Sequence, residues 1–529
     1  MYLHYLKSNV KMEPLIWRWY AWPHLIPPLT AACNIVERHL KIMHSYVQNP
    51  QIHMEAMKDP KLLGGPFIDL EGKYIDEIQS LIRQTETNCA KLIQINNDLK
   101  SFDQLLQSKA EGDSLEELYN SIPSSLKGLV ELVYDLNNHP SIRIIEYLVY
   151  HKHYTSAPQE IALGPIDGDF RKFVLSTPRI YQDSEIYIPI PFSDKNIDLL
   201  SKMRYEPDDI KKIENIFGIP EEKKKLFQSF FTTEPPRLNS SRNYTGNDIR
   251  VRYFGHACVL VETSKVCILF DPVISYDIES NIPRFSFNDL PDVIDYVIIT
   301  HNHQDHLIFE ILLQLRYKTR NIVFARSQIG TLQDPSVKLI LQNTGFSSLI
   351  ELGEFESINF SGGKIMAIPF FGEHSDLNIQ SKSSFLVSIN NTKFLFAADS
   401  NNLDPNLYNN IYDIVGPADI IFLGMECDGA PLTWLYGPLL SKPIKRIHDR
   451  NRSLSGSDYN KAGQIIKKLE CKEVYVYAMG QEPWLGHIMS LHYTSDSKQI
   501  LESDKLLNYC RENGIKSERL YCTKEWYFQ

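Results

Sequence analysis

The sequence predicts a two-domain α/β protein, in which a mixed α+β N-terminal domain over residues 1–231 is followed by a linker over 232–247 and a C-terminal domain over 248–529. Three observations support this organisation. The 529 residues are more than one ordinary hydrophobic core accommodates. The segment 232–247, TTEPPRLNSSRNYTGN, is rich in turn formers and poor in apolar residues. Beyond it, short apolar runs each end at polar residues, which is typical of a layered sheet structure with a site at its rim.

The bulk composition indicates a globular protein and excludes several classes of partner. Hydrophobic residues make up 43% and charged residues 23%, and the net charge of −10 offers no broad basic face for nucleic acid. No apolar run approaches the ~20 residues that span a bilayer, and the N-terminus lacks the features of a signal peptide. The eight cysteines form no CxxC pair, which favours reduced thiols. We therefore expect a cytoplasmic protein with neither a nucleic-acid nor a membrane partner.

The N-terminal half mixes helical and extended patterns. Residues 12–30, aromatic and proline-rich, predict packed irregular chain. Apolar residues recur at helical spacing from Tyr74 to about Leu106, which predicts one or two long helices. The remaining expectations are a helix over 114–136, strands over 142–149, 173–175 and 186–190, and helical chain over 206–231.

The C-terminal half reads as a succession of strands with polar ends. The expected strands cover 249–254, 258–262, 266–270, 292–300, 364–371, 385–389, 393–396, 419–423 and 473–478. Several of them end next to a histidine or a carboxylate. This pattern predicts a site built from many strand ends along the rim of a sheet sandwich.

The most specific motif is ThrHisAsnHisGlnAspHis at 300–306. His301 and His303 alternate on extended chain, so their imidazoles project to the same side. A helix expected over 307–317 would place Asp305 and His306 at its start. This arrangement would give two ligands to one metal ion and two to a neighbouring metal ion. Imidazole together with carboxylate suits zinc, iron or manganese. The alternative, that these are solvated histidines of a loop without a metal, is disfavoured because three histidines and an aspartate at this spacing rarely occur together by chance.

Four further residues could complete such a site. Glu373 could bind the first metal, although the neighbouring His374 competes for that role. Asp399 ends an apolar strand and could bridge two metals, while Glu426 is a ligand, an acceptor that orients a histidine, or a plain structural acid. Asp271 and His256 are expected to be structural or to orient the ligands, whereas three later histidines are expected to be ordinary surface or core residues: His448, His487 and His492.

The C-terminal half resembles the metallo-β-lactamase superfamily. The resemblance rests on FGHACVLVE at 254–262, ILFDP at 268–272, the 300–306 block and Asp399, in matching order across roughly 250–490. It implies an αββα sandwich. Hydrolases of this superfamily carry a histidine after the strand that precedes the bridging aspartate. Here Glu373 comes first at that position, with His374 beside it, and the late strand over 473–478 runs into Gln481 and Glu482 instead of a histidine. A site richer in carboxylate favours iron over zinc.

The whole chain also resembles the diiron β-hydroxylases, of which the enzyme of chloramphenicol biosynthesis is the example. RWYAWPHLIPP at 18–28, KLLGGPF at 61–67 and GEHSD at 372–376 carry this resemblance. It implies a monooxygenase of antibiotic biosynthesis with two iron ions, O₂ as co-substrate and an external electron donor. Its substrate would be an amino acid held as a thioester on the phosphopantetheine arm of a peptide-synthetase carrier domain.

By this resemblance His301, His303 and Glu373 would hold one iron, and Asp305 and His306 the second. Asp399 would bridge them, Glu426 would be a less certain member, and Glu373 and Asp399 would be the catalytic pair. The N-terminal domain would serve substrate access or a homodimer interface. The alternative is a dizinc hydrolase of a lactone, thioester or phosphodiester, using His374 with His487 or His492 as a late ligand. A flavodiiron protein would need a flavin domain that the residues after Met489 cannot form, and a metal-free scaffold would not keep the 300–306 block.

Overall fold

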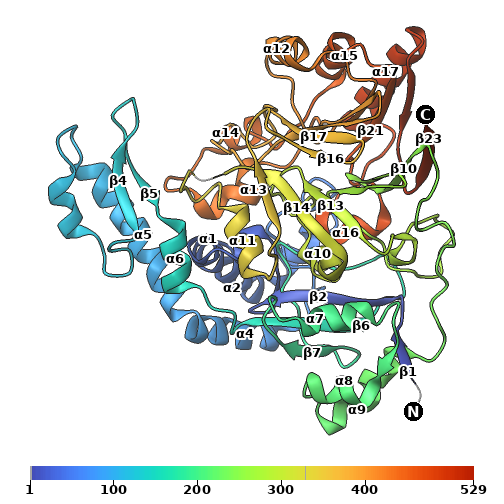
Figure 1. Ribbon diagram of the computed structural model, residues 1–529. Coiled ribbons are helices and arrows are strands. Elements are labelled where there is room, and N and C mark those ends of the chain that lie inside the picture. Colours follow the sequence, from blue (N-terminus) through green and yellow to red (C-terminus); the bar gives the residue numbers. More distant parts are fainter. Residues whose placement is uncertain (1–2, 328) are drawn as a thin grey trace.

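The computed structural model describes residues 3–327 and 329–529, and its C-terminal half is built on two facing sheets (Figure 1). The first sheet has the order β15 (Leu349–Leu352), β14 (Thr319–Ala325), β13 (Ile294–Ile299), β12 (Cys267–Phe270), β11 (Cys258–Glu262), β10 (Ile249–Gly255), β23 (Lys524–Phe528). The second has the order β16 (Ser357–Phe360), β17 (Gly363–Ile368), β18 (Ser384–Ile389), β19 (Thr392–Phe396), β20 (Ile420–Gly424), β21 (Glu473–Tyr477), β22 (Lys516–Arg519).

Helices cover the outer face of each sheet, so the predicted αββα sandwich is confirmed. Side chains from both inner faces form one core, in which the rings of Phe270 and Phe396 stack at 3.8 Å. The first sheet packs on α10 (Phe309–Leu315) and α11 (Val337–Asn343). The second packs on the helices at the top of Figure 1, namely α12 (Asn406–Val415), α15 (Tyr459–Lys468) and α17 (Lys498–Glu512).

Strand direction brings the polar strand ends to one rim. β12, β13 and β14 run parallel in the first sheet, and β19, β20 and β21 run parallel in the second. The chain leaves β13 directly before His301, β19 shortly before Asp399 and β20 shortly before Glu426. Because the carboxyl ends of parallel strands meet at one edge, these side chains converge.

The N-terminal half contains three small sheets and most of the remaining helices. The four-stranded sheet has the order β3 (Trp19–Tyr20), β2 (Val10–Ile16), β6 (Gln159–Pro165), β7 (Ile186–Pro189). The others are β8 (Asp208–Asp209), β1 (Leu3–Leu6), β9 (Phe231–Thr232) and the hairpin β4 (Val130–Tyr134), β5 (Pro140–Ile144). The helices are α1 (Pro28–Asn34), α2 (Lys41–Gln48), α3 (Pro50–Ala56), α4 (Ile75–Asn88), α5 (Ala90–Lys109), α6 (Glu146–His153), α7 (Asn196–Lys202), α8 (Ile210–Ile216) and α9 (Glu221–Ser229).

Four local expectations for this half are wrong, two of them in part. Residues 114–136 form a short 3-10 turn, Glu116–Ser121, and then strand β4, because Pro123 and Gly128 interrupt any helix. Residues 173–175 are a turn, and the second part of 142–149 begins α6. Residues 12–30 are partly regular, since all of β2 pairs with β6. The helices expected over 74–106 and 206–231 and the strand over 186–190 are confirmed.

The two halves share one hydrophobic core. Leu25 and Leu29 belong to the same buried cluster as Leu432 and Leu439 of the C-terminal half. Residues 233–248 run without helix or strand between β9 and β10, and a domain boundary at 232–247 stays a prediction. All eight cysteines are buried and none is paired. Within the described ranges, no helix combines the length and the apolar character that crossing a membrane requires.

Candidate metal centre

The histidine block lies where the chain passes from β13 to α10. His301, His303, Asp305 and His306 are all buried. The helix expected over 307–317 is present as α10, followed by a 3-10 turn over Arg316–Lys318. The block is therefore held between a central strand and a helix packed on the sheet, which is a rigid support for a site.

One group of ligand atoms surrounds Glu373. His303 Nδ1 lies 3.0 Å from Glu373 Oε1, and His301 Nε2 lies 3.8 Å from Glu373 Oε2. His374 Nδ1 approaches the same Oε2 at 3.0 Å. Atoms of these four residues lie within 4.8 Å of one another, close enough to share one metal ion. The geometry by itself keeps both Glu373 and His374 as candidates.

A second group surrounds Asp399. His306 Nε2 lies 3.1 Å from Asp399 Oδ2 and 3.4 Å from Asp305 Oδ2. His301 Nε2 lies 3.7 Å from the same oxygen of Asp399. Because His301 also belongs to the first group, Asp399 stands between the two positions, where a bridging carboxylate would lie.

The polar atoms that converge here lack other partners. His301 Nε2, His306 Nε2 and Asp399 Oδ1 form no hydrogen bond, and neither do Glu373 Oε2 and His374 Nε2. A buried polar atom without a partner costs about 1–3 kcal/mol, so a cluster of five points to a missing ligand. Three histidines with three carboxylates fit two metal ions, and the high share of oxygen donors suits iron.

Two residues orient the ligands from behind. His306 Nδ1 donates to Asp271 Oδ2 across 2.9 Å, which leaves Nε2 free for metal. The backbone N–H of Gly480 donates to His256 Nδ1 at 3.2 Å, so His256 Nε2 carries its proton and donates to Asp305 Oδ2 at 3.1 Å. His256 lies within reach of a metal shared with Asp305 and His306, but its hydrogen bonds assign it to positioning Asp305.

Glu373 is presented by a strained turn. Glu373, Ser375 and Asp376 all have positive φ, at 66°, 54° and 57°. Gly372, at φ 77°, precedes them, and a Cβ there would lie 2.4 Å from Asn401 Cβ. Such conformations persist where the surroundings enforce them and concentrate at functional sites.

The electrostatics differ between the two positions. Burial raises the pKa of Glu373 to about 7, against the opposing charge of His303. Burial would also raise the pKa of Asp305, but His306, His256 and His303 outweigh it and hold that pKa below its usual range. Glu426 is partly buried, and burial together with Asp399, Asp305 and Glu373 raises its pKa well above the usual range. Glu426 thus faces the cluster but forms no part of the metal-binding groups among the described residues.

Two residues near the cluster had no signal in the sequence. Tyr436, at the end of α13 (Leu432–Tyr436), places its hydroxyl 2.9 Å from His303 Nε2. His24 packs edge-on against Tyr436, with ring centroids 6.0 Å apart. Each is a single residue far along the chain from the other site residues or from the 300–306 block, so no spacing could reveal it.

The late histidines do not reach the cluster. His487 Nε2 lies 4.0 Å from Glu310 Oε2, on the side facing the N-terminal half. His448 and His492 are exposed. Within the part of the chain that the structure describes, none of the three joins a metal-binding group.

Comparisons with known proteins agree with this geometry. Residues 5–235 match a family model for the N-terminal domain of diiron non-heme β-hydroxylases, and 267–431 match a β-lactamase superfamily domain. The chain is 34% identical over 525 residues, 98% of each chain, to the 4-amino-L-phenylalanyl-[CmlP-peptidyl-carrier-protein] 3-hydroxylase of Streptomyces venezuelae. A metal-dependent hydrolase of Rhizobium johnstonii is 32% identical over 114 residues, 21% of this chain and 45% of that one.

The similarity extends to three dimensions. The crystal structure of CmlA, a diiron β-hydroxylase from Streptomyces venezuelae, superposes with a TM-score of 0.92 at 33% identity and covers 100% of both chains. A CmlA variant superposes with a TM-score of 0.90. A full-length match of this kind includes both the metal-binding half and the N-terminal half, and the chain therefore belongs to the family of diiron non-heme β-hydroxylases with a metallo-β-lactamase fold.

Proposed function

We propose that this protein uses O₂ to hydroxylate the β-carbon of an amino acid tethered as a thioester to the phosphopantetheine arm of a peptide-synthetase carrier domain. The observation that carries the proposal is the carboxylate content of the cluster. Asp305, Glu373 and Asp399 all reach it, and oxygen donors suit iron in its higher oxidation states. The similar hydroxylase of Streptomyces venezuelae acts on an aminoacyl carrier protein, which supports the same class of partner here.

We assign the ligands as follows. His301, His303 and Glu373 would hold one iron, Asp305 and His306 the other, and Asp399 would bridge them. Glu426, whose carboxyl is close enough for the charge of Asp399 to raise its pKa, stays a proposed further member. Bound iron, with electrons from an external donor, would supply the oxygen chemistry.

The protein's own groups prepare the site. Asp271 and His256 fix the orientation of His306 and Asp305 through hydrogen bonds of 2.9 and 3.1 Å. The Tyr436 hydroxyl forms a hydrogen bond with His303 Nε2, the ring nitrogen that does not face Glu373. All ligands are buried, so water is largely excluded where the substrate's β-hydrogen is removed. Glu373 and Asp399 are the proposed catalytic pair, because each has a buried oxygen, Glu373 Oε2 and Asp399 Oδ1, that forms no hydrogen bond within the protein.

A dizinc hydrolase is the less favoured function. It would need a late histidine in place of a carboxylate, and His487 and His492 lie away from the cluster. His374 remains close enough to bind, so its contribution is decided by experiment. We keep the cytoplasm as the proposed location and a homodimer as a proposed assembly.

Metal analysis of the full-length protein tests the proposal. Protein produced with both iron and zinc available should contain about two irons per chain, consistent with a carboxylate-rich dinuclear site. Glu373→Gln should lose the first iron, whereas His374→Asn, its matched neighbour, should retain both. Two zincs that persist after reconstitution with iron, or loss of metal in His374→Asn alone, would contradict the assignment. An aminoacyl carrier protein plus reductant and O₂ should then yield a product heavier by one oxygen.

A further inference from the structure

Arg38 is a buried cation without an anionic partner. Its side chain is 6% exposed and follows α1 in the π-helical turn Ile35–Leu40. One terminal nitrogen, Nη2, donates to the carbonyls of Trp434 and Leu435 at 2.6 and 2.9 Å. The other, Nη1, has no hydrogen-bond partner. Among the described residues no carboxylate forms an ion pair with Arg38, since the adjacent Glu37 pairs with Lys41 at 2.6 Å.

An unpaired buried guanidinium is costly and needs an anion. Burial lowers the pKa of Arg38 only to about 10, so the group stays charged at neutral pH. Buried charges in proteins are normally paired, as Arg171 is with Glu13 and Glu310, both at 2.8 Å. A guanidinium with a free edge is suited to a phosphate.

Arg38 lines an open pocket of about 340 Å³ between the two halves of the chain. One wall is α2 and the turn before it, and the opposite wall is α13 with Pro438. The glycine loop 64–66, part of the 61–67 motif, closes one side, where a Cβ on Gly65 would lie 3.2 Å from the Trp434 ring. Apart from Arg38, Lys41 and Glu37, the lining is mainly apolar with three hydroxyls: Ile42, Ser45, Pro66, Phe173, Leu175, Ser176, Thr433, Trp434 and Pro438. An extended, weakly polar ligand with one anionic group fits these walls.

Tyr436, on the pocket wall α13, contacts the proposed metal ligand His303, and packed side chains lie between Arg38 and Tyr436. The Arg38 guanidinium lies 5.6 Å from the Trp22 ring, and Trp22 stacks on His24 at 5.0 Å. His24 contacts Tyr436, whose hydroxyl reaches His303. Both ring nitrogens of His24 lack partners although the residue is 2% exposed.

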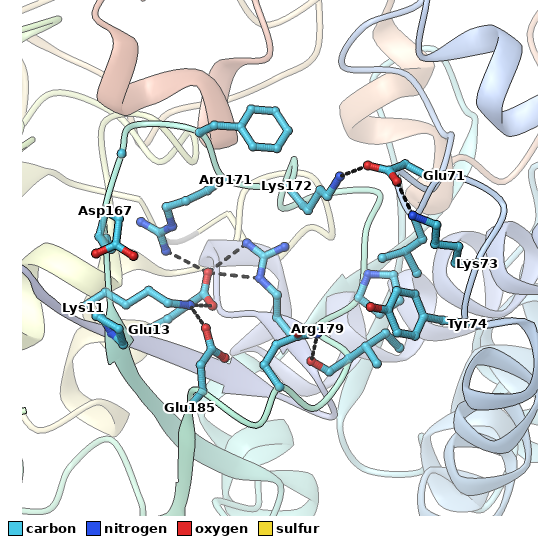
Figure 2. A pocket seen from close by; sticks show the side chains of 18 residues that line it. Lys11, Glu13, Glu71, Lys73, Tyr74, Asp167, Arg171, Lys172, Arg179 and Glu185 are labelled. Carbon is cyan, nitrogen blue, oxygen red and sulfur yellow. Dashed lines mark hydrogen bonds and ion pairs between the residues drawn. The ribbon is translucent and has the colours of Figure 1, made fainter. Parts of the chain in front are cut away.

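The larger pocket shown in Figure 2, of about 610 Å³, has no comparable unpaired cation among its described lining residues. Its cations face acids of the same pocket. Glu13 binds Lys11, Arg171 and Arg179 at 2.8–3.0 Å, and Glu71 binds Lys73 at 2.7 Å. Because these charges neutralise one another, they do not call for an ionic ligand, and we favour the smaller pocket.

We propose that the pocket at Arg38 receives the phosphopantetheine arm of the carrier domain, with Arg38 contacting its phosphate. This rests on the proposed function, because it names where the arm that carries the tethered substrate binds. The phosphate would pair with the charge of Arg38, and the apolar walls would hold the arm beside α13, whose Tyr436 contacts His303.

Binding of two small probes to the full-length, iron-loaded protein tests the site. The probes are 4′-phosphopantetheine and pantetheine, both S-methylated so that no thiol reaches the metal, and calorimetry gives their affinities. The phosphorylated probe should bind at least about tenfold more tightly, as expected for hydrogen bonds to a charged group. Arg38→Met should abolish this preference and leave pantetheine within about threefold of its original affinity. Lys41→Met, whose cation is exposed and already paired, should keep the preference.

A second variant covers a failure of Arg38→Met to fold. Ser45→Trp, at an exposed position of the rim, should weaken both probes by filling the pocket. Equal affinities of the two probes for the wild-type protein, a preference that survives Arg38→Met, or unchanged binding to Ser45→Trp would each overturn the proposal. A protein that shows the phosphate preference but no O₂-dependent turnover would instead overturn the proposed function alone.

Discussion

Asp271 accepts the Nδ1 proton of His306 across 2.9 Å, and this contact decides which nitrogen of the imidazole faces Asp399. The same carboxylate accepts hydrogen bonds from the backbone N–H and the hydroxyl of Thr300 at 2.8 and 2.6 Å. One buried acid therefore holds both the start of the histidine block and its last member. A residue outside the proposed ligand set therefore controls the geometry of the proposed second metal position.

Asp271→Asn should weaken the second metal by about 10- to 100-fold, because an amide nitrogen facing His306 would favour the tautomer that carries its proton on Nε2. Metal affinity can be measured by competition with a chelator. Asp295→Asn is a matched control at the opposite end of β13, where Asp295 accepts the backbone N–H of Cys267. Equal affinities in the Asp271→Asn and wild-type proteins would show that the tautomer is fixed by another contact.

Gly424 leaves room for Asp399, the proposed bridging carboxylate. A Cβ at this position would lie 2.5 Å from Asp399 Oδ1 and 2.8 Å from the carbonyl oxygen of Ala398. Gly424→Ala should therefore displace Asp399 and lower metal affinity by at least about tenfold, as loss of a supporting contact does. Gly463→Ala, where nothing lies within 4 Å of the added Cβ, should keep both metals and stabilise α15 by roughly 0.5–1 kcal/mol. Retention of both metals by Gly424→Ala would mean that the strand end can relax.

Much of the C-terminal half could be predicted because its information is local. The strands are short apolar runs bounded by turns, and the 300–306 block carries four side chains that can bind metal within seven residues. The choice between Glu373 and His374 could not be predicted, because both side chains reach the same oxygen-rich space from adjacent positions of a strained turn.

The N-terminal half was harder because tertiary packing decides it. Pro14 lies inside β2 even though proline disfavours a central strand, and aromatic residues of 17–22 belong to the same buried cluster as residues of α10 and α13. Tyr436 and His24 come to the site from segments more than 400 residues apart, and such a pairing has no periodicity. No sequence motif includes Arg38, and only the unpaired guanidinium nitrogen in the structure distinguishes it.

Glu262 on β11 and the arginines Arg250 and Arg252 on β10 form a buried ion cluster that should stabilise the fold strongly. Glu262 is 1% exposed and binds Arg250 and Arg252, each through two hydrogen bonds of 2.9–3.1 Å. Glu262→Gln would leave two buried cations without a charge partner and should cost about 3–5 kcal/mol of the free energy of unfolding. Chemical denaturation measures this cost. Glu131→Gln, which breaks the exposed pair with Arg143, should change stability by no more than about 1 kcal/mol.

The contact between α6 and the start of α11 should make stability depend on pH. Burial, followed by the charge of Asp334, raises the pKa of Glu146 from 4.5 to about 7, and the carboxylate accepts the backbone N–H of Ser336 at 2.9 Å. Between pH 4.5 and about pH 7 the folded protein holds the proton of Glu146 more tightly than the unfolded chain does. The free energy of unfolding therefore falls as the pH rises through this range. The contribution that is lost by pH 8 is at most about 3 kcal/mol.

Glu146→Gln keeps an oxygen acceptor for Ser336 but cannot ionise. Its melting temperature should match that of the wild-type protein at pH 5 and exceed it increasingly from pH 6 to pH 8, since only the wild-type protein has to bury a charge there. The exposed Glu131→Gln variant should run parallel to the wild-type protein across the same range. If Glu146→Gln also runs parallel, the carboxylate of Glu146 is solvated in the folded state and burial does not govern its proton.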